Sequence, residues 1–360
     1  MPVSIVDLFC GVGGLTKGLE LSGLNVVAGL DFDETCKYAY ETNNDALFFH
    51  RDITTVTGDE LRELFPDNHI RVLVGCAPCQ PFSKLTQRYR KEEKEKGREG
   101  DQWQSDNKWR LLYSFAELVR EILPAVVSME NVPELRNEQV FLDFVNTLIG
   151  LGYQVNYQVV FCPDYGVPQN RKRLVLLASR LGAIELIAPT HTPENYRTVR
   201  DVIGELPPIE DGLPNTQDPL HNAAKLSKTN KKRIRQSVQG GTWHDWDDDL
   251  RLKCHKKETG HTYASIYGRM CWEKPSPTIT TQFFGYGNGR FGHPEQNRAL
   301  SMREGALLQS FPPDYRFYDY ESVVSRKEVG VHIGNAVPVE LGRAIGLTIA
   351  NHLREVENHG

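Results

Sequence analysis

Cys79 is the residue of this 360-residue chain with the clearest chemical potential. It follows the apolar run 72–75 and stands between Pro78 and Pro81, which fix two φ angles and remove two amide donors. The loop is therefore stiff, and it begins where a buried strand is expected to end, which is where open α/β sheets carry their ligands. A cysteine held in this way is placed to act as a nucleophile. The alternative is a small, buried apolar residue, as most free cysteines are.

A carboxylate and two guanidinium groups stand at the ends of two further apolar runs. Glu130 follows the run 125–129. Because glutamate is seldom fully buried without a partner, it is either a capping residue or a functional acid. Arg171 and Arg173 stand just before the run 174–178, where they either bring positive charge to the sheet edge or form a surface basic run.

The glycine-rich segment 7–14 predicts a ligand-binding turn between the first strand and the first helix, because glycines let a ligand approach the backbone closely. Neither phosphate-binding pattern is met there. A Walker A loop needs glycine directly before Lys-Ser/Thr, and a dinucleotide fingerprint that starts at Gly11 needs glycine where Thr16 stands. Asp31 is at the distance from Gly11 at which a carboxylate reaches ribose hydroxyls, and Asp52 could accept a hydrogen bond from an adenine amino group. This pattern points to S-adenosylmethionine; the alternative is a structural turn with solvated acids.

The elements that must position these residues are short apolar runs that alternate with helical patterns. This alternation predicts an α/β, Rossmann-like sheet over about residues 1–180. The segment 336–353 shows helical spacing after Pro338 and is expected to pack back on the same domain. The predicted strands lie at 3–9, 26–32, 71–77, 125–129, 153–161 and 174–178.

A change in composition marks a second, smaller and less regular domain at 183–329. Prolines accumulate in 188–224, the segment 225–236 carries six basic and no acidic residues, and an acidic patch follows at 245–249. We therefore predict one domain from 1–182 plus 330–360, and a second domain with its hinge from 183–329.

Overall composition limits the classes of function. With a net charge of −5, any nucleic-acid surface must be a local basic patch. No run approaches the ~18 apolar residues of a membrane span. Seven irregularly spaced cysteines argue against a disulfide framework and favour a reducing, cytoplasmic compartment.

Taken in order, the motifs resemble those of the DNA (cytosine-5) methyltransferases of bacterial restriction–modification systems. The resemblance spans nearly the whole chain, and chance would not bring together the Cys79 loop, Glu130 and Asn335. The motifs are Asp-Leu-Phe-Cys-Gly-Val-Gly-Gly (7–14), Pro-Cys-Gln-Pro-Phe-Ser (78–83), Glu-Asn-Val (130–132), Gln-Asn-Arg-Lys-Arg (169–173), the segment 298–312 and Gly-Asn-Ala-Val-Pro (334–338).

The resemblance implies a role for each matching residue. Cys79 would add to C6 of a cytosine flipped out of the duplex, Glu130 would bind the N3/N4 edge of the base, and Arg173, with Arg171 beside it, would contact the base carbonyl or position the cysteine. The segment 84–110 matches a loop that closes over DNA and carries Ser83 toward the DNA backbone. The implied S-adenosylmethionine contacts are Phe9, Gly11, Gly13, Gly14, Asp31, Phe32, Asp52, Ile53, Pro78 and Asn335; the expected DNA contacts beyond Ser83 are Lys225, Lys231, Lys232, Arg233 and Arg235.

The same resemblance makes 183–329 the target-recognition domain and its hinge, and double-stranded DNA the partner. It also implies a separate restriction endonuclease, a monomeric state and no metal. Asp31 stands where glutamate is common in the family, so its shorter side chain puts the ribose contact in question.

Three alternatives remain. A tRNA cytosine-5 methyltransferase keeps the chemistry, but its Cys-Phe-Thr element is absent from 183–280. Cys76 and Cys79 form a CxxC pair, yet structural zinc needs four ligands, and Gln80-Pro81 would interrupt the helix that a redox motif requires. A catalytically inactive DNA-binding relative is the third possibility, although every residue with an implied catalytic role is present.

Overall fold

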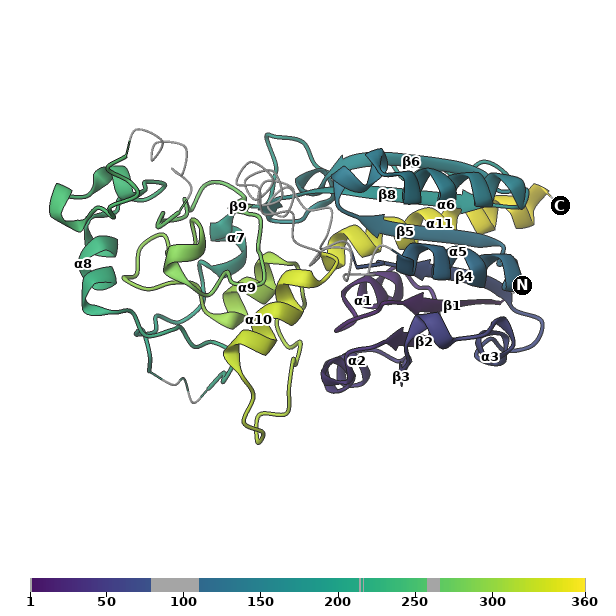
Figure 1. Ribbon diagram of the computed structural model, residues 1–360, viewed down its shortest axis with the longest axis horizontal. Coiled ribbons are helices and arrows are strands. Elements are labelled where there is room, and N and C mark those ends of the chain that lie inside the picture. The colour runs from purple at the N-terminus through teal and green to yellow at the C-terminus, as the bar shows by residue number, and fades with distance from the viewer. Residues whose placement is uncertain (1, 79–109, 214, 216, 258–265, 360) are drawn as a thin grey trace, which may run out of the picture. The chain divides into compact units, whose positions relative to one another are not determined.

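The computed structural model describes residues 2–78, 110–213, 215, 217–257 and 266–359 (Figure 1). The chain forms two compact units. Unit 1 comprises Met1–Phe161, Lys172–Ala188 and Val339–Gly360, and unit 2 comprises Cys162–Arg171 and Pro189–Pro338. The assignment of catalytic and recognition functions to two domains stays a prediction.

Unit 1 is built on a seven-stranded sheet of order β3-β2-β1-β4-β5-β8-β6. β8 runs antiparallel to both of its neighbours, whereas β1 to β5 pair in parallel. The chain moves outward from β1 through β2 to β3 and then resumes on the other side of β1 with β4. The strand order therefore reverses between β1 and β4, and at such a switch point an open α/β sheet binds its ligands outside the carboxyl ends of the strands. The strands are β1 Val3–Leu8, β2 Val26–Asp31, β3 Leu47–His50, β4 Ile70–Gly75, β5 Val126–Asn131, β6 Gln154–Phe161 and β8 Lys172–Ser179.

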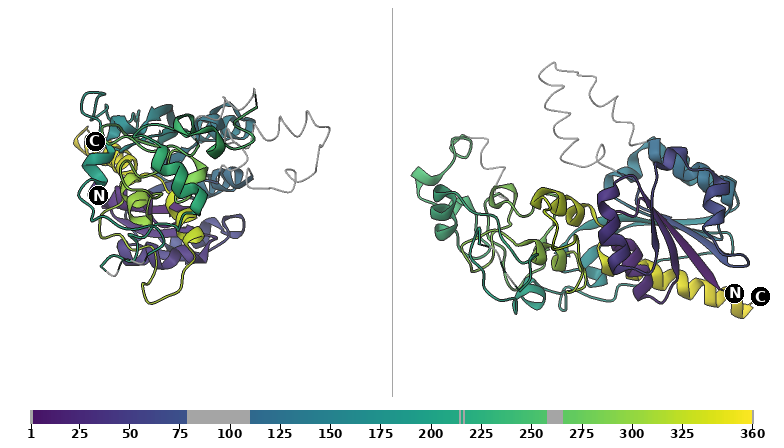
Figure 2. Two further views of the ribbon diagram at one scale, coloured as in Figure 1. Left: turned by 90° about the vertical axis from the view of Figure 1, so that its left-hand side faces the viewer. Right: turned by 90° about the horizontal axis from the view of Figure 1, so that it is seen from below.

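Helices cover both faces of this sheet (Figure 2). The C-terminal helix α11 (Val339–His359) packs closely on α1 (Gly14–Leu21), because glycines remove side chains from the contact. A Cβ at Gly18 would lie 2.4 Å from the carbonyl oxygen of Val339. The tail thus packs on unit 1, as its helical spacing predicted. The other helices and 3-10 turns of unit 1 are η1 Glu34–Cys36, α2 Lys37–Asn43, η2 Ile53–Thr55, α3 Gly58–Glu63, α5 Leu111–Ile122, η6 Pro133–Asn137 and α6 Gln139–Gly150.

The core of unit 1 lies between the sheet and the helices α3, α5 and α6. Phe115 from α5 and Phe144 from α6 are fully buried there, with ring centroids 5.3 Å apart, above Leu73 and Met129 of the central strands. Burying side chains of this size contributes roughly 1.5–3 kcal/mol each. The strand ends at the switch point therefore stand on a rigid base.

Unit 2 has short elements joined by long connections. Its elements are η7 Cys162–Tyr165, β7 Gln169–Asn170, α7 Val199–Ile203, α8 Lys228–Gln236, η8 Trp243–Asp245, η9 Asp248–Leu250, β9 Ser276–Pro277, η11 Tyr286–Asn288, α9 Met302–Leu308 and α10 Arg326–Asn335. None of the helices in the described parts of either unit combines the length and apolar character needed to cross a membrane.

Buried arginines take the place of regular ladders in unit 2. Arg269 donates hydrogen bonds to the carbonyls of Ile234, Ser237 and His293, among others. Arg298 pairs with both oxygens of Glu304 at 2.6 and 2.7 Å. Burial alone raises the pKa of Glu304, but Arg298, His293 and the amide of Ser301 together outweigh it and lower that pKa to about 2. Such charge-assisted bonds satisfy backbone groups that a loop-rich fold leaves without strand partners.

Candidate active site

Glu130 lies at the end of β5 and is held by Arg173 from the neighbouring strand β8. In the antiparallel register Glu130 stands opposite Val175. Because side chains on one face of a strand recur every two residues, Arg173 is its diagonal neighbour on that face, within reach of a long side chain. Arg173 Nε lies 2.7 Å from Glu130 Oε1, and the Glu130 side chain is only 3% exposed. A buried carboxylate therefore has its cationic partner in place.

Cys76 contacts the same carboxylate from the opposite side. β4 pairs with β5 in parallel up to Gly75 opposite Met129, so Cys76 follows at the level of Glu130. Its Sγ donates a hydrogen bond of 2.9 Å to Glu130 Oε2. Three adjacent strands thus converge on one carboxylate, with a guanidinium group on one oxygen and a thiol on the other.

Asn131 fixes the backbone that leads toward Cys79. It is buried, its Nδ2 donates to the carbonyl of Ala77 at 3.0 Å, and its Oδ1 accepts from the amide of Val132 at 2.9 Å. Pro78 is the last described residue before the gap; Cys79 and Ser83 lie outside the described residues. Asn131 was not predicted as a site residue, although it is the middle residue of the Glu-Asn-Val motif.

The glycine turn after β1 is tied to the end of β2. Phe9, Gly11 and Gly13 have φ values of 59°, 51° and 83°, a left-handed conformation that glycine adopts most easily. The amide of Gly11 donates to Asp31 Oδ2 at 2.8 Å, and Asp31 Oδ1 accepts from the amide of Asp33 at 2.9 Å. Burial raises the pKa of Asp31 despite these bonds. A Cβ on Gly11 would meet no atom within 4 Å, so the space beside the turn is open.

Asp7 lies beneath this turn and is almost wholly buried. Its Oδ2 accepts from Thr16 Oγ1 at 2.7 Å, and Thr16 in turn contacts the hydroxyl of Tyr40 at 3.0 Å. Its Oδ1 has no hydrogen-bond partner among the described residues. Burial is the main reason that the pKa of Asp7 rises to about 7.

Three further predicted cofactor residues follow β2 and β3. Asp52 caps the turn η2 by accepting from the amide and hydroxyl of Thr54 at 2.9 and 2.8 Å. Phe32 is 71% exposed, an unusual state for a phenylalanine, and its carbonyl accepts from His50 Nε2 at 2.9 Å. Ile53 is buried beside Asp52. The carboxyl ends of β1, β2 and β3 thus present an open glycine turn, a fixed carboxylate and an exposed ring, which fit a nucleoside with its ribose on Asp31.

Arg171 and Asn335 belong to unit 2, whereas the residues described so far belong to unit 1. Arg171 is 4% exposed and donates to the carbonyl of Ile279 at 3.0 Å and of Gly334 at 3.5 Å. It therefore joins backbone segments within unit 2, whereas Arg173 contacts Glu130 in unit 1. Asn335 is exposed at the last position of α10.

The basic residues predicted to contact DNA divide into two groups around α8. Lys231 pairs with Asp211 at 2.7 Å. Arg233 donates to the carbonyl of Leu250 at 2.9 Å and stacks over Trp246, 5.2 Å from the ring centre, so it stabilises unit 2.

The other group is exposed. Lys225 is exposed before α8. Residues four and seven apart share a helix face, so Lys228, Lys232 and Arg235 form one exposed row, which we call the basic stripe. Lys228 adds to the predicted set, and its spacing from Lys232 was the signal for it.

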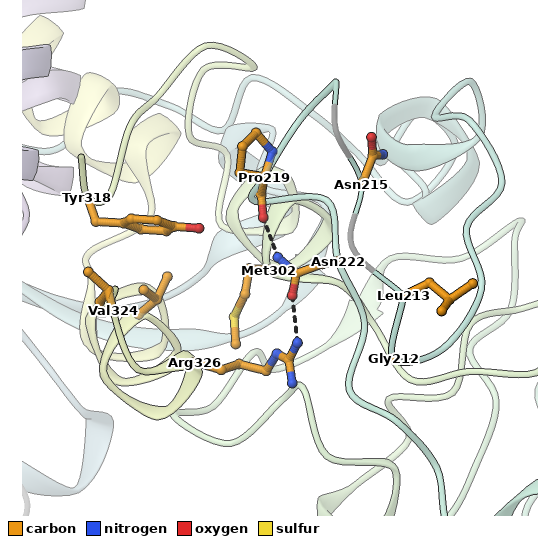
Figure 3. Close-up of a pocket in the computed structure, with 10 residues that line it drawn as sticks. Gly212, Leu213, Asn215, Pro219, Asn222, Met302, Tyr318, Val324 and Arg326 are labelled. Atoms are coloured by element: carbon orange, nitrogen blue, oxygen red, sulfur yellow. Dashed lines mark hydrogen bonds between the residues drawn. The ribbon is translucent and has the colours of Figure 1, made fainter. Parts of the chain in front are cut away.

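A cavity of about 380 Å³ lies within unit 2 (Figure 3). Asn222 and Arg326 face each other across it, joined by a hydrogen bond of 2.8 Å from Nη2 to Oδ1. Burial lowers the pKa of Arg326. The residues that line the cavity are Gly212, Leu213, Asn215, Pro219, Asn222, Met302, Tyr318, Val324, Arg326 and Val329, none of which was predicted as a site residue.

The sheet order and the residues at its switch point define a Rossmann-like, S-adenosylmethionine-dependent methyltransferase fold, which confirms the predicted α/β class. A family model for C-5 cytosine-specific DNA methylases matches residues 3–351. The chain belongs to this family, and the predicted enzyme class, a DNA (cytosine-5) methyltransferase, is confirmed.

Individual relatives agree with this assignment. The chain is 53% identical over 353 residues to the Type II methylase M.HgiDII of Herpetosiphon aurantiacus, covering 97% of this chain and 96% of that one. It is 28% identical to the Type II methyltransferase M.MthTI of Methanothermobacter thermautotrophicus, with 99% and 100% covered. Among solved structures, a chain assigned as a prophage-encoded DNA modification methyltransferase of E. coli has the same fold, with a TM-score of 0.72, 21% identity and coverage of 98% and 99%. Because the family model describes DNA methylases and both relatives carry Type II names, the tRNA alternative is not favoured.

Proposed function

We propose that this enzyme methylates C5 of a flipped-out cytosine within a specific double-stranded DNA sequence, as the modification enzyme of a Type II restriction–modification system. Both relatives described above carry Type II names. The observation that carries the catalytic part of the proposal is the buried carboxylate of Glu130, gripped by Arg173 at the strand ends beside the switch point.

Cys79 is the proposed nucleophile. Its thiolate bonds to C6 of the cytosine, which makes C5 electron-rich enough to take a methyl group. Loss of the C5 proton then breaks the C6–S bond and frees the thiolate. Asn131 holds the carbonyl of Ala77, two residues before Cys79, and so fixes the chain as it enters this loop.

Glu130 and Arg173 form the proposed base-binding pair. Glu130 binds the N3/N4 edge of the flipped cytosine and keeps negative charge from building up on the ring, while Arg173 fixes the carboxylate and faces the base carbonyl. Arg171 is proposed to act beside Arg173; within unit 2 it donates to the carbonyls of Ile279 and Gly334.

S-adenosylmethionine, when bound, supplies an electrophilic methyl group. We assign its ribose to Asp31, its adenine to Phe32, Asp52 and Ile53, and its amino-acid end to the turn of Phe9, Gly11, Gly13 and Gly14. The exposed ring of Phe32 and the open space at Gly11 support this assignment. Pro78 and Asn335 are further proposed contacts.

Unit 2 is the proposed target-recognition domain. Lys225 and the basic stripe are exposed and therefore suited to phosphate contacts. Lys231 and Arg233 already have partners within the unit, and Ser83 is proposed to approach the DNA backbone. We further propose that the enzyme works as a monomer in the cytoplasm of a bacterial cell, without a metal, and that a separate endonuclease cuts the unmodified sequence.

Bisulfite sequencing of a plasmid from cells that express the enzyme tests the proposal. We expect methylated cytosine at one recurring sequence, and none with the Cys79→Ser variant. The purified variant should still bind S-adenosylmethionine, since no cofactor contact depends on the thiol. Methylation by the variant, or loss of cofactor binding together with activity, would refute the role of Cys79 as nucleophile.

A further inference from the structure

The thiol of Cys76 has no role in the chemistry described so far, yet it contacts the central carboxylate. Its Sγ lies 2.9 Å from Glu130 Oε2, while Arg173 Nε lies 2.7 Å from Oε1. The side chain of Glu130 is 3% exposed, so water contributes little to holding the carboxylate. Each oxygen is thus contacted by a different side chain, one from Cys76 directly after β4 and one from Arg173 in β8.

The charge on Glu130 determines which group donates the hydrogen bond between Cys76 and Glu130. A carboxylate that faces a guanidinium group is an acceptor, so the thiol is the donor and keeps its proton. Arg173 pairs with one oxygen by charge, and that oxygen has no hydrogen-bond partner among the described residues, so the carboxyl group could turn about its terminal torsion, which is broad and roughly two-fold. The hydrogen bond from Cys76 to the other oxygen removes that freedom.

We propose that Cys76 is a positioning residue for the methylation reaction, which sets the orientation of the Glu130 carboxylate before cytosine enters. This proposal rests on the function proposed for Glu130. A thiol is a weak donor, so the amino group of cytosine can replace it at small cost when the base arrives. The proposed role differs from that of Cys79, because Cys76 forms no bond to the base and acts only through Glu130.

The test compares Cys76→Ala, which removes the donor, with Cys76→Ser, which keeps one. Methyl transfer is measured on a duplex that the wild-type enzyme methylates, with kcat and kcat/KM for DNA determined separately, together with S-adenosylmethionine affinity. We expect Cys76→Ala to lower kcat/KM about tenfold and to change kcat little, because the thiol orients the carboxylate in the free enzyme and the base replaces it in the complex. Cys76→Ser should stay within about threefold of the wild type, and cofactor affinity should not change in either variant.

Cys271→Ala is the matched control, since this thiol also contacts a side-chain oxygen, that of Gln239 at 3.5 Å, but within unit 2. It should leave kcat and kcat/KM unchanged. If Cys76→Ala does not fold, as judged by thermal melting, Cys76→Gly removes the donor without adding bulk and takes its place.

Two results would overturn the proposal. One is a donor-free variant with wild-type kcat/KM for DNA. The other is an equal loss in the alanine and serine variants, which would make the role steric. If the proposed function itself is wrong, the wild-type enzyme will not methylate any DNA duplex, and this result is distinct from both outcomes above.

Discussion

Replacing Asp7 by asparagine should make the stability of this enzyme less dependent on pH. In the folded state Asp7 is buried, one of its oxygens has no partner among the described residues, and its pKa is about 7 in place of the ordinary 3.8. The folded protein therefore holds this proton more tightly than the unfolded chain does. The resulting stabilisation is fully present below pH 3.8 and is lost as the pH rises through 7.

The size of the effect follows from the two pKa values. A difference of 7 − 3.8 pH units corresponds to about 4 kcal/mol over the whole range, at 1.36 kcal/mol per unit. Between pH 5 and pH 8.5 the wild-type enzyme should lose about 3 kcal/mol of unfolding free energy through this group alone. The asparagine side chain does not titrate and can still accept a hydrogen bond from Thr16, so the Asp7→Asn variant should lack this part of the slope.

Urea unfolding at pH 5 and pH 8.5, without cofactor, measures the effect. Groups that do not interact with Asp7 titrate alike in both proteins, so the difference between their slopes reports on Asp7 and on its coupling to Asp31 and Cys10. Asp67→Asn is the control, because Asp67 is exposed and its replacement should leave the wild-type slope unchanged. If Asp7→Asn loses as much stability between the two pH values as the wild type, the buried proton on Asp7 does not exist.

Three further sets of variants test Glu130, Asn131 and the basic stripe. Arg173→Ala leaves Glu130 buried without its cation and should cost about 3–5 kcal/mol of unfolding free energy. The double variant Arg173→Ala/Glu130→Gln removes the buried charge as well and should recover part of this loss. Equal losses in the single and the double variant would argue against the ion pair. Asn131→Ala frees the carbonyl that it holds and should lower kcat by about 10–100-fold while S-adenosylmethionine affinity stays unchanged, so a wild-type kcat would remove its positioning role. Replacing all three residues of the basic stripe by glutamine should reduce the slope of the logarithm of the DNA-binding constant against the logarithm of the salt concentration by about 2.7, or about 0.9 for each phosphate contact. Lys231→Gln should not change this slope. Identical slopes in the wild type and the stripe variant would exclude these phosphate contacts.

Site residues could be predicted from the sequence where their residue type and their position at the end of an apolar run both indicated a function. Glu130 and Arg173 stand at the ends of apolar runs, so their arrival at one edge of a sheet could be predicted before the register was known. The exposed ring of Phe32 and the tie between Gly11 and Asp31 likewise agree with a turn that binds a nucleoside. Alternating strands and helices were enough for the α/β class.

The residues that sequence reasoning missed depend on register and on remote partners. Cys76 reaches Glu130 only because β4 pairs with β5 in one particular register, and Asn131 binds the carbonyl of Ala77 for the same reason. In the basic run, Lys231 finds Asp211 and Arg233 finds the carbonyl of Leu250. Charge and spacing along the chain carry no information on such partners, so every basic residue there had seemed equally free to contact DNA.

Trapping the enzyme on DNA tests the central claim most directly. A duplex that carries 5-fluorocytosine at the methylated position has no C5 proton to lose, so the bond between sulfur and C6 cannot break after methyl transfer. With S-adenosylmethionine present, the wild-type enzyme should form a complex that survives denaturation, and Cys79→Ser should form none. A wild-type enzyme that methylates the ordinary duplex but is never trapped on the fluorinated one would contradict the account.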